Sequence, residues 1–257
     1  MKILHVADLH FRQPWYEWVA AQSNHFDAVC IAGDLLNVWI TRDVSLRAQS
    51  QWVRDWARYT FKGRLFVCSG NHDWWTNDEI IDTDASAGWL RKLRRPEVTC
   101  DNHGARLGDI FFYCHAYAAR APFPTIETNQ WILLHHEPPS GCDAAVAGDS
   151  GSDLGTSYLR DQLCATKHAP LFVLSGHVHQ PKSWRGKSDR SWILNPGFDS
   201  EVRVPNHLKI DLSAGLEQFK LNCSRSFLLC HRETREARRG DPAGLLRREA
   251  PRNDRFG

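Results

Sequence analysis

The sequence has little net charge, no long apolar run and no closely paired cysteines. Its 257 residues include 32 Lys and Arg against 30 Asp and Glu, so the formal net charge is only +2. A chain without a strong positive field is not built to coat nucleic acid. No apolar stretch approaches 18 residues, so we expect no membrane-spanning helix. The first apolar run meets Asp8 and His10 before a signal-peptide core forms, and we therefore expect a cytoplasmic protein.

The eight cysteines lack a C-x-x-C motif, and Cys30, Cys68 and Cys114 lie inside apolar runs. We expect reduced thiols in the core, with a disulfide or a reactive thiol as the alternative. A chain with 42% hydrophobic and 24% charged residues is typical of a globular protein. At this length it buries a sufficient core without a structural metal, so any metal serves chemistry.

The first ninety residues alternate short apolar runs with amphipathic stretches, which is typical of β-α-β units. This pattern predicts strands over 2–7, 28–32 and 64–68, a helix over 44–59 capped by Asp43, and a weaker helix over 79–93. The later part favours antiparallel strands over 98–101, 109–113, 131–134, 171–174, 191–194 and 207–212, with a helix over 154–167. Together these elements predict a mixed-sheet α/β domain over 1–221.

The last segment, 222–257, has a different composition, with nine Arg, no Lys and five acidic residues. Frequent Gly, Pro and Arg predict a poorly ordered tail. The alternative is a basic arm that binds nucleic acid or an acidic partner.

Residues of the types that bind metal ions follow five of the predicted strands. They are Asp8 and His10, then Asp34, then Asn71 with His72 and Asp73, then His135 and His136, then His177 and His179. The carboxyl ends of strands in open α/β sheets are where ligands bind, so we expect these side chains to converge. Each motif alone has a structural explanation as a turn or a strand end. Their arrival together at strand ends predicts a metal centre.

Carboxylate, imidazole and amide ligands suit Mn²⁺, and they also accept Fe, Zn or Ni. The alternating pairs Asp8/His10 and His177/His179 would each place two side chains on one side of an extended segment. Seven ligands exceed one tetrahedral site and suit two divalent ions that share a carboxylate.

The ordered set D-x-H, G-D, G-N-H-D, H-x-P-P and G-H-x-H resembles the signature of the calcineurin-like metallophosphoesterases. The resemblance runs from Asp8 to His179 and extends to the Asn-Pro-Gly turn at 195–197. It implies a four-layer α/β/β/α sandwich of two mixed β-sheets flanked by helices. It also implies a dinuclear metal centre that hydrolyses phosphate esters through a metal-activated hydroxide.

The resemblance also assigns the ligands. The first metal would be held by Asp8, His10, Asp34 and His179, and the second by Asn71, His136 and His177, with Asp34 bridging. His136 fits H-x-P-P better than His135, which stays the alternative. Many relatives carry an acidic residue where Asn37 stands, and we expect this departure to alter hydrogen bonding around the ligands without loss of the site.

The same resemblance places the general acid at His72. Asp73 would either orient the His72 ring or stabilise the turn. Candidate substrate-binding residues are Arg12, Trp39 and Trp74, although a tryptophan in the core is the alternative for each indole. The expected substrate is a small or nucleotide-like phosphate monoester or diester. The alternatives are a DNA-processing nuclease, which the Arg-rich tail would favour, and a non-catalytic metal-binding scaffold.

Overall fold

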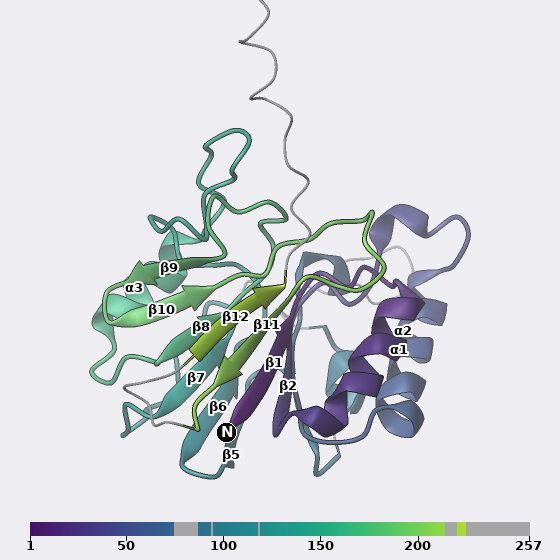
Figure 1. Cartoon of the computed structure of the whole chain (residues 1–257), viewed down its shortest axis with the longest axis horizontal. Coiled ribbons are helices and arrows are strands. Elements are labelled where there is room, and N and C mark those ends of the chain that lie inside the picture. Colours follow the sequence, from purple (N-terminus) through teal and green to yellow (C-terminus); the bar gives the residue numbers. More distant parts are fainter. Residues whose placement is uncertain (75–86, 94, 118, 214–219, 225–257) are drawn as a thin grey trace, which may run out of the picture. The chain divides into compact units, whose positions relative to one another are not determined.

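The computed structural model describes residues 1–74, 87–93, 95–117, 119–213 and 220–224. Two six-stranded sheets form the described part (Figure 1). The first has the order β12-β11-β1-β2-β3-β4, and the second has the order β5-β6-β7-β8-β10-β9. The first sheet contains β1 (Lys2–Val6), β2 (Ala28–Ala32), β3 (Leu65–Cys68), β4 (Val98–Thr99), β11 (His207–Asp211) and β12 (Lys220–Ser224). The second contains β5 (His103–Leu107), β6 (Ile110–Cys114), β7 (Trp131–Leu134), β8 (Phe172–Leu174), β9 (Arg185–Ser188) and β10 (Ser191–Leu194).

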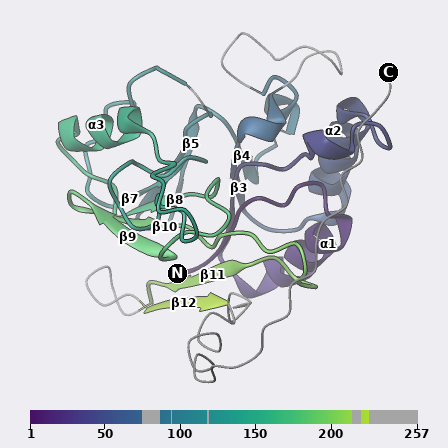
Figure 2. The same ribbon diagram turned by 90° about the horizontal axis from the view of Figure 1, so that it is seen from above.

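Three α-helices in the described part of the chain cover the outer faces of the sheets, and Figure 2 shows α1 and α2 on the opposite side of the strands from α3. Their bounds are α1 (Gln13–Gln22), α2 (Leu46–Asp55) and α3 (Ser157–Ala165). No helix in the described ranges is both long and apolar enough to cross a membrane.

The alternation of side chains along the strands builds a core between each pair of layers. Leu4 and Val6 of β1 face outward and pack with Trp15 and Val19 of α1. Ile3 of the same strand faces the other sheet and belongs to the core between the sheets, together with the side chains of Phe66, Phe112, Ile132 and Leu174. A third core joins Leu133 and Val173 to Leu159 and Leu163 of α3. Because a strand points successive side chains to opposite faces, the central strands of both sheets are buried on both sides, which gives the expected four-layer sandwich.

The direction of the later strands differs from the sequence-based expectation. The central strands β6, β7, β8 and β10 run parallel, and antiparallel pairing is confined in this sheet to the edge strands β5 and β9. Long connections join β6 to β7 and β7 to β8, and parallel strands need such crossovers. In the second sheet, too, the carboxyl ends of several strands therefore lie at one edge.

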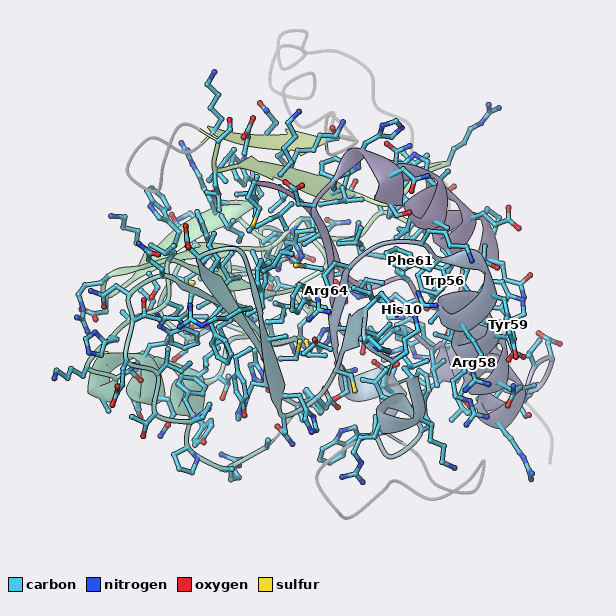
Figure 3. The ribbon with its side chains drawn as sticks, turned by 90° about the horizontal axis from the view of Figure 1, so that it is seen from below. His10, Trp56, Arg58, Tyr59, Phe61 and Arg64 are labelled. Carbon is cyan, nitrogen blue, oxygen red and sulfur yellow. The ribbon has the colours of Figure 1, made fainter. Side chains whose placement is uncertain are left out.

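Helix boundaries also correct the sequence-based prediction. The sequence pattern missed α1, whose buried Trp15, Tyr16 and Val19 make only a narrow apolar stripe. Ser45, not Asp43, caps α2 by accepting a hydrogen bond from the Ala48 N–H at 3.3 Å. A helical turn, Trp56–Thr60, continues α2. Of the residues of this turn that Figure 3 labels, Trp56 is buried and Tyr59 is exposed.

Two predicted segments fall largely outside the described residues. The helix over 79–93 ends in a described helical turn, Leu90–Leu93, but most of it is not described. Of the tail over 222–257, the first three residues lie in β12 and the rest are outside the described ranges.

Candidate metal centre

The seven predicted ligands come from the carboxyl ends of strands in both sheets. Asp8 and His10 follow β1, Asp34 follows β2 and Asn71 follows β3. His136 follows β7 of the second sheet, and His177 and His179 follow β8. The parallel strands of both sheets therefore end at the same place, and the ligands from the two sheets meet there.

The backbone around the ligands is not the extended segment that the sequence suggested. Positive φ angles occur at Asp8 (+55°), His10 (+43°), Asp34 (+52°) and His177 (+67°). Such angles are uncommon for residues other than glycine and cost about 1–3 kcal/mol each. Backbone hydrogen bonds hold two of these turns against each other: Asp8 N–H donates to Gly33 O at 3.1 Å, and His10 N–H to Asp34 O at 2.9 Å. Left-handed backbone, and not strand alternation, therefore sets the directions of Asp8, His10 and His177.

Four of the ligands form a cluster that we call the carboxylate group: Asp8, His10, Asp34 and His179. One ligand atom from each lies within 4.8 Å of every other. The Nε2 atoms of His10 and His179 are 3.1 Å apart, and His179 Nε2 is 3.8 Å from Asp8 Oδ1. Two nitrogens that each lie about 2.1 Å from one ion are separated by roughly 3.0–3.4 Å, so these rings are spaced as ligands of a shared ion.

The other three ligands form a second cluster, which we call the amide group: Asn71, His136 and His177. Asn71 Oδ1 lies 3.0 Å from His136 Nε2 and 3.0 Å from His177 Nδ1. His135 is elsewhere, because its Nδ1 lies 3.3 Å from His115 O and its ring packs on the His115 ring. Of the two neighbouring histidines, His136 is therefore the one that the structure brings to the cluster.

Asp34 lies between the two groups. Its Oδ1 is 3.4 Å from His136 Nε2 in the amide group. Its Oδ2 is 3.9 Å from His10 Nε2 in the carboxylate group. The Asp34 side chain is only 3% exposed, so this carboxylate has little contact with water.

Further polar contacts hold the ligands in place. His136 Nδ1 lies 2.8 Å from Ala32 O, so this nitrogen donates and leaves Nε2 free to bind a metal. Asn195, in the Asn-Pro-Gly turn, donates from Nδ2 to Gly176 O at 2.9 Å and to Val178 O at 3.0 Å. These two carbonyls flank His177, so Asn195 fixes the loop that carries a ligand of each group.

Glycine is required at two positions because the side chain of a ligand lies too close for a Cβ atom. A Cβ at Gly70 would collide with the Asp34 carboxylate, and a Cβ at Gly33 would collide with the His136 ring. Gly33 also has φ +80°, which side chains disfavour. The glycines of the G-D and G-N-H-D motifs thus leave room for ligands that come from other strands.

Burial controls the protonation of the cluster. It lowers the pKa of His10 to about 3 and that of His177 to about 4, so both rings are neutral at pH 7 and able to bind a metal. Burial raises the pKa of Asp8 to about 7. Burial also lowers the pKa of His136, but the Asp34 and Asp8 carboxylates outweigh it and raise that pKa to about 10. Burial opposes ionisation of Asp34, and the nearby His136 still holds the Asp34 pKa below its usual range.

The chemistry of the cluster fits divalent metal ions. Asp8 Oδ2 and His10 Nδ1 are buried and have no hydrogen-bond partner in the described part of the chain. A buried carboxylate oxygen without a partner is costly unless a cation neutralises it. Carboxylate, imidazole and amide donors are also the ligands that Mn²⁺, Fe and Zn accept.

His72 and Asp73 have separate surroundings. Val38 N–H donates to His72 Nδ1 at 3.4 Å, so the neutral ring carries its proton on Nε2, which lies 3.9 Å from Asp34 Oδ2. Burial lowers the pKa of His72, and the Asp34 charge opposes this. The Asp73 carboxylate accepts hydrogen bonds from three backbone N–H groups: Leu35 at 3.2 Å, Leu36 at 2.9 Å and Gly70 at 2.8 Å. These contacts correspond to the turn-stabilising alternative for Asp73.

The three predicted substrate-binding residues lie at different distances from the ligands. The Trp39 ring is 5.3 Å from the His10 ring and 4.4 Å from the His72 ring. The Trp74 ring contacts Tyr117 at 5.5 Å, and Tyr117 in turn contacts His136 at 6.0 Å. The Arg12 guanidinium lies 4.7 Å from the Trp15 ring, and that ring packs on Phe198.

Sequence reasoning did not select Phe198 or Tyr117. The Phe198 ring lies 4.9 Å from the His10 ring and 4.6 Å from the His179 ring. Its position directly after the Asn-Pro-Gly turn was a usable signal. Tyr117 lies in a connection without a motif, and only the fold brings it to His136.

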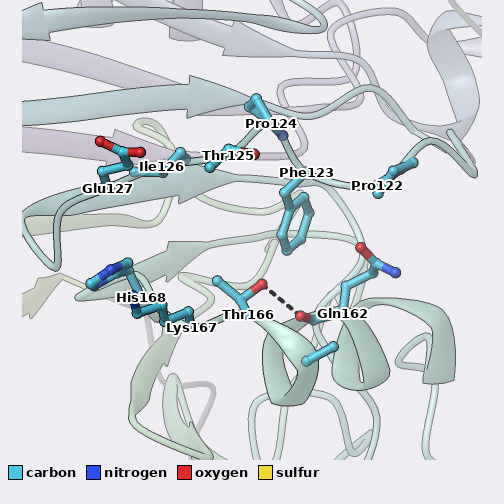
Figure 4. Close-up of a pocket in the computed structure, with 11 residues that line it drawn as sticks. Pro122, Phe123, Pro124, Thr125, Ile126, Glu127, Gln162, Thr166, Lys167 and His168 are labelled. Carbon is cyan, nitrogen blue, oxygen red and sulfur yellow. Dashed lines mark hydrogen bonds between the residues drawn. The ribbon is translucent and has the colours of Figure 1, made fainter.

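A separate pocket of about 650 Å³ lies between the loop at 122–127 and the end of α3 (Figure 4). Phe123 points into it from the loop, and Lys167 and His168 line the other side. None of its lining residues belongs to either ligand group.

Comparison with known proteins identifies the family. The family model of calcineurin-like phosphoesterases matches residues 1–181. The chain belongs to the calcineurin-like phosphoesterase family. As a member it is a hydrolase that acts on phosphoric ester bonds with the help of divalent metal ions, for which the carboxylate group offers a site.

Two solved structures show how widely this calcineurin-like phosphoesterase fold is shared. TT1561 of Thermus thermophilus is 15% identical, with a TM-score of 0.55 over 87% of this chain and 99% of that one. Purple acid phosphatase PPD1 from yellow lupin (Lupinus luteus) seeds is 12% identical, with a TM-score of 0.52 over 82% of this chain and 49% of that one. At these identities the likeness is one of fold. The search of curated proteins gives no match.

Proposed function

We propose that this phosphoesterase works with a dinuclear centre, in which the carboxylate group holds one divalent ion and the amide group holds the other. The observation that carries this proposal is the position of Asp34, with Oδ1 toward His136 and Oδ2 toward His10. Two bound ions supply a water of lowered pKa, and hence a hydroxide nucleophile, together with positive charge for the phosphate oxygens. Mn²⁺ is the ion that we propose, because hard and borderline ligands are mixed here.

His72 is proposed as the general acid. The Val38 N–H on its Nδ1 leaves the proton on Nε2, the atom that faces Asp34 and the ligand cluster. Protonation to the imidazolium, which the Asp34 charge favours, makes the Nε2 proton available to the oxygen of a leaving alcohol and leaves a neutral ring. His72 N–H also donates to Asp34 Oδ1 at 2.8 Å, so the backbone of the same residue orients the shared carboxylate.

Asp73 is proposed as a positioning residue. Its carboxylate joins the turn after β2, through Leu35 and Leu36, to the turn after β3, through Gly70. These two turns carry Asp34 and Asn71, one ligand common to both groups and one of the amide group. Asp73 therefore fixes the separation between them without contact with the substrate.

The proposed substrate is a small or nucleotide-like phosphate ester, and the proposed location is the cytoplasm. The location is supported by Cys30, Cys68 and Cys114, which are buried in the core as free thiols. Nuclease activity rests only on the Arg-rich tail, which lies largely outside the described residues, so we keep it as an outcome of the test.

Metal content and a substrate screen test the proposal. The Mn²⁺-loaded chain should hold about two equivalents of metal and hydrolyse members of a panel of phosphomonoesters, cyclic nucleotides, other phosphodiesters and single- and double-stranded DNA. His136→Ala should lose one equivalent, whereas the neighbouring His135→Ala should keep both. A single equivalent in the unmodified chain, or equal metal content in the two variants, would contradict the dinuclear assignment.

A further inference from the structure

Trp39 is a large apolar side chain left in water. It is 67% exposed and is the most exposed large hydrophobic residue of the described chain. Most other tryptophans of the described ranges are partly or fully buried, for example Trp15 and Trp131 at 2% and 0%. An indole that contributes so little to the core has much of its surface available for a ligand.

The exposed indole lies beside the ligand cluster. Its ring centroid is 4.4 Å from that of His72, edge to face, and 5.3 Å from that of His10. Phe198 packs on His10 at 4.9 Å and is itself held by Trp15 at 5.6 Å. Phe198 is therefore part of the packed wall around His10, and Trp39 is the aromatic side chain that extends from this wall into solvent.

Hydrogen bonds define the position of Trp39 despite its exposure. Asn37 Oδ1 accepts from Trp39 N–H at 2.9 Å, which caps the short helical turn Val38–Ile40. The buried Gln49 side chain accepts from Asn37 N–H at 2.8 Å and donates to Asn37 O at 3.0 Å. A turn held from α2 in this way fixes the backbone that carries the ring, so less conformational entropy is lost when a ligand stacks on it.

The neighbour of Trp39 indicates which part of the substrate reaches it. Under the proposed function His72 gives a proton to the leaving oxygen, so the leaving alcohol lies next to His72. Trp39 contacts that same ring, whereas the other aromatic pair, Trp74 and Tyr117, lies toward His136.

We propose that Trp39 binds a flat aromatic ring carried by the leaving group of the substrate. This inference rests on the proposed function, since the His72 assignment sets the side of the site. The substrate class is a phosphoric ester whose leaving alcohol bears an aryl or heteroaryl ring within one or two bonds of the ester oxygen. Stacking of a base on an aromatic side chain is worth roughly 1–3 kcal/mol, equivalent to about 5–150-fold in affinity.

A pair of non-hydrolysable probes tests the inference by binding alone. In 2-phenylethylphosphonate a carbon replaces the leaving oxygen of benzyl phosphate, and 2-cyclohexylethylphosphonate is its saturated match. By calorimetry on the Mn²⁺-loaded chain, Trp39→Ala should weaken binding of the phenyl probe at least about 5-fold and that of the cyclohexyl probe less. Trp39→Phe should retain most of the affinity.

Tyr59→Ala is the matched control, because Tyr59 is also exposed, at 65%, and its recorded cation contact is with Arg58. It should bind both probes like the unmodified chain, and all variants should keep their metal content. The proposal is overturned if Trp39→Ala leaves the difference between the probes unchanged, or if the unmodified chain binds neither probe or binds both equally.

Hydrolysis of benzyl and cyclohexylmethyl phosphates, and of their methyl diesters, separates this inference from the proposed function. Metal-dependent hydrolysis with no Trp39-dependent preference for the benzyl esters overturns the inference and leaves the proposed function intact. Trp39-dependent binding of the phenyl probe without hydrolysis of any ester supports the aromatic site and contradicts the proposed function.

Discussion

The carboxylate group and the amide group differ in charge and in the origin of their geometry. The carboxylate group contains two buried carboxylates, on Asp8 and Asp34, and three of its four ligands have left-handed backbone, against His177 alone in the amide group. The amide group brings no carboxylate of its own, and its His136 is aligned by the Ala32 carbonyl. The first group therefore supplies the negative charge that attracts cations, and the charges of Asp34 and Asp8 also act on His136 of the second group.

This difference teaches that the two halves of the site are not equivalent. We expect a substitution at Asp34 to affect both groups and a substitution at Asn71 to affect only the amide group. The turns that support each half also differ: Asn195 fixes the loop of His177 and His179, and Gln49 fixes the turn of Trp39 beside His72. Variants that act on one half at a time test the comparison directly.

The largest effect is expected at the shared carboxylate. Asp34→Asn should lower kcat/KM by roughly 10⁴-fold or more and reduce the content of both metals, since it removes the charge of the carboxylate that lies between the two groups. Asn71→Ala should lose mainly one equivalent and retain more activity. Metal analysis beside steady-state kinetics checks this, and equal residual activity would count against Asp34 as the bridge.

A large but selective effect is expected at His72. His72→Ala should lose roughly 10²–10⁴ in rate on esters with alkoxide leaving groups, the range for a positioned general acid. Nitrophenyl esters need little protonation of the leaving group and should be much less affected. Metal content should stay near normal, and equal losses on both classes of substrate would assign His72 a different role.

A smaller effect should distinguish Asn195 from Gln49, the two residues that support the turns around the site. Asn195→Ala should weaken metal binding by about 10–100-fold, because the loop that carries His177 and His179 loses its anchor. Gln49→Ala should leave metal affinity nearly unchanged but lower the rate on alkyl esters more than on nitrophenyl esters, since the turn that donates to His72 loosens. Metal titration and the two substrate classes, measured on both variants, distinguish these outcomes.

The smallest expected effect is on the stability of the fold, and it involves Asp101. Burial raises the pKa of Asp101 to about 6, although its Oδ1 accepts from Ser69 N–H at 2.8 Å. An acid with a raised folded-state pKa favours folding at low pH, and this contribution is lost as the pH rises from about 4 to about 6.

Asp101→Asn keeps an acceptor for Ser69 and removes the charge. We expect this variant to have a Tm a few degrees higher than the unmodified chain at pH 7.5 and little difference at pH 4, where both side chains are neutral in the folded state. Thermal unfolding of both proteins at the two pH values checks this. A Tm gain of equal size at pH 4 would contradict the assigned cause.

The sequence alone located the chemistry, because apolar strands followed at once by Asp, Asn and His place those residues at the carboxyl ends of a sheet. The family, the four-layer sandwich and the assignment to phosphoester hydrolysis were expected from those motifs and are confirmed. The ligand set stays a prediction of the sequence, and the structure brings its seven members into two touching groups.

Other features depended on contacts between distant segments, which no local pattern encodes. The left-handed backbone of Asp8 and His10 is fixed by the carbonyls of Gly33 and Asp34, and Asp73 is engaged by the turn after β2. The parallel order of β6, β7, β8 and β10 was set by long crossovers and by burial of both faces of the second sheet. The sequence determined which residues could bind a metal. Only the tertiary structure decided how these residues meet and why Trp39 remains exposed beside them, because their backbone partners and packing arise when the two sheets come together.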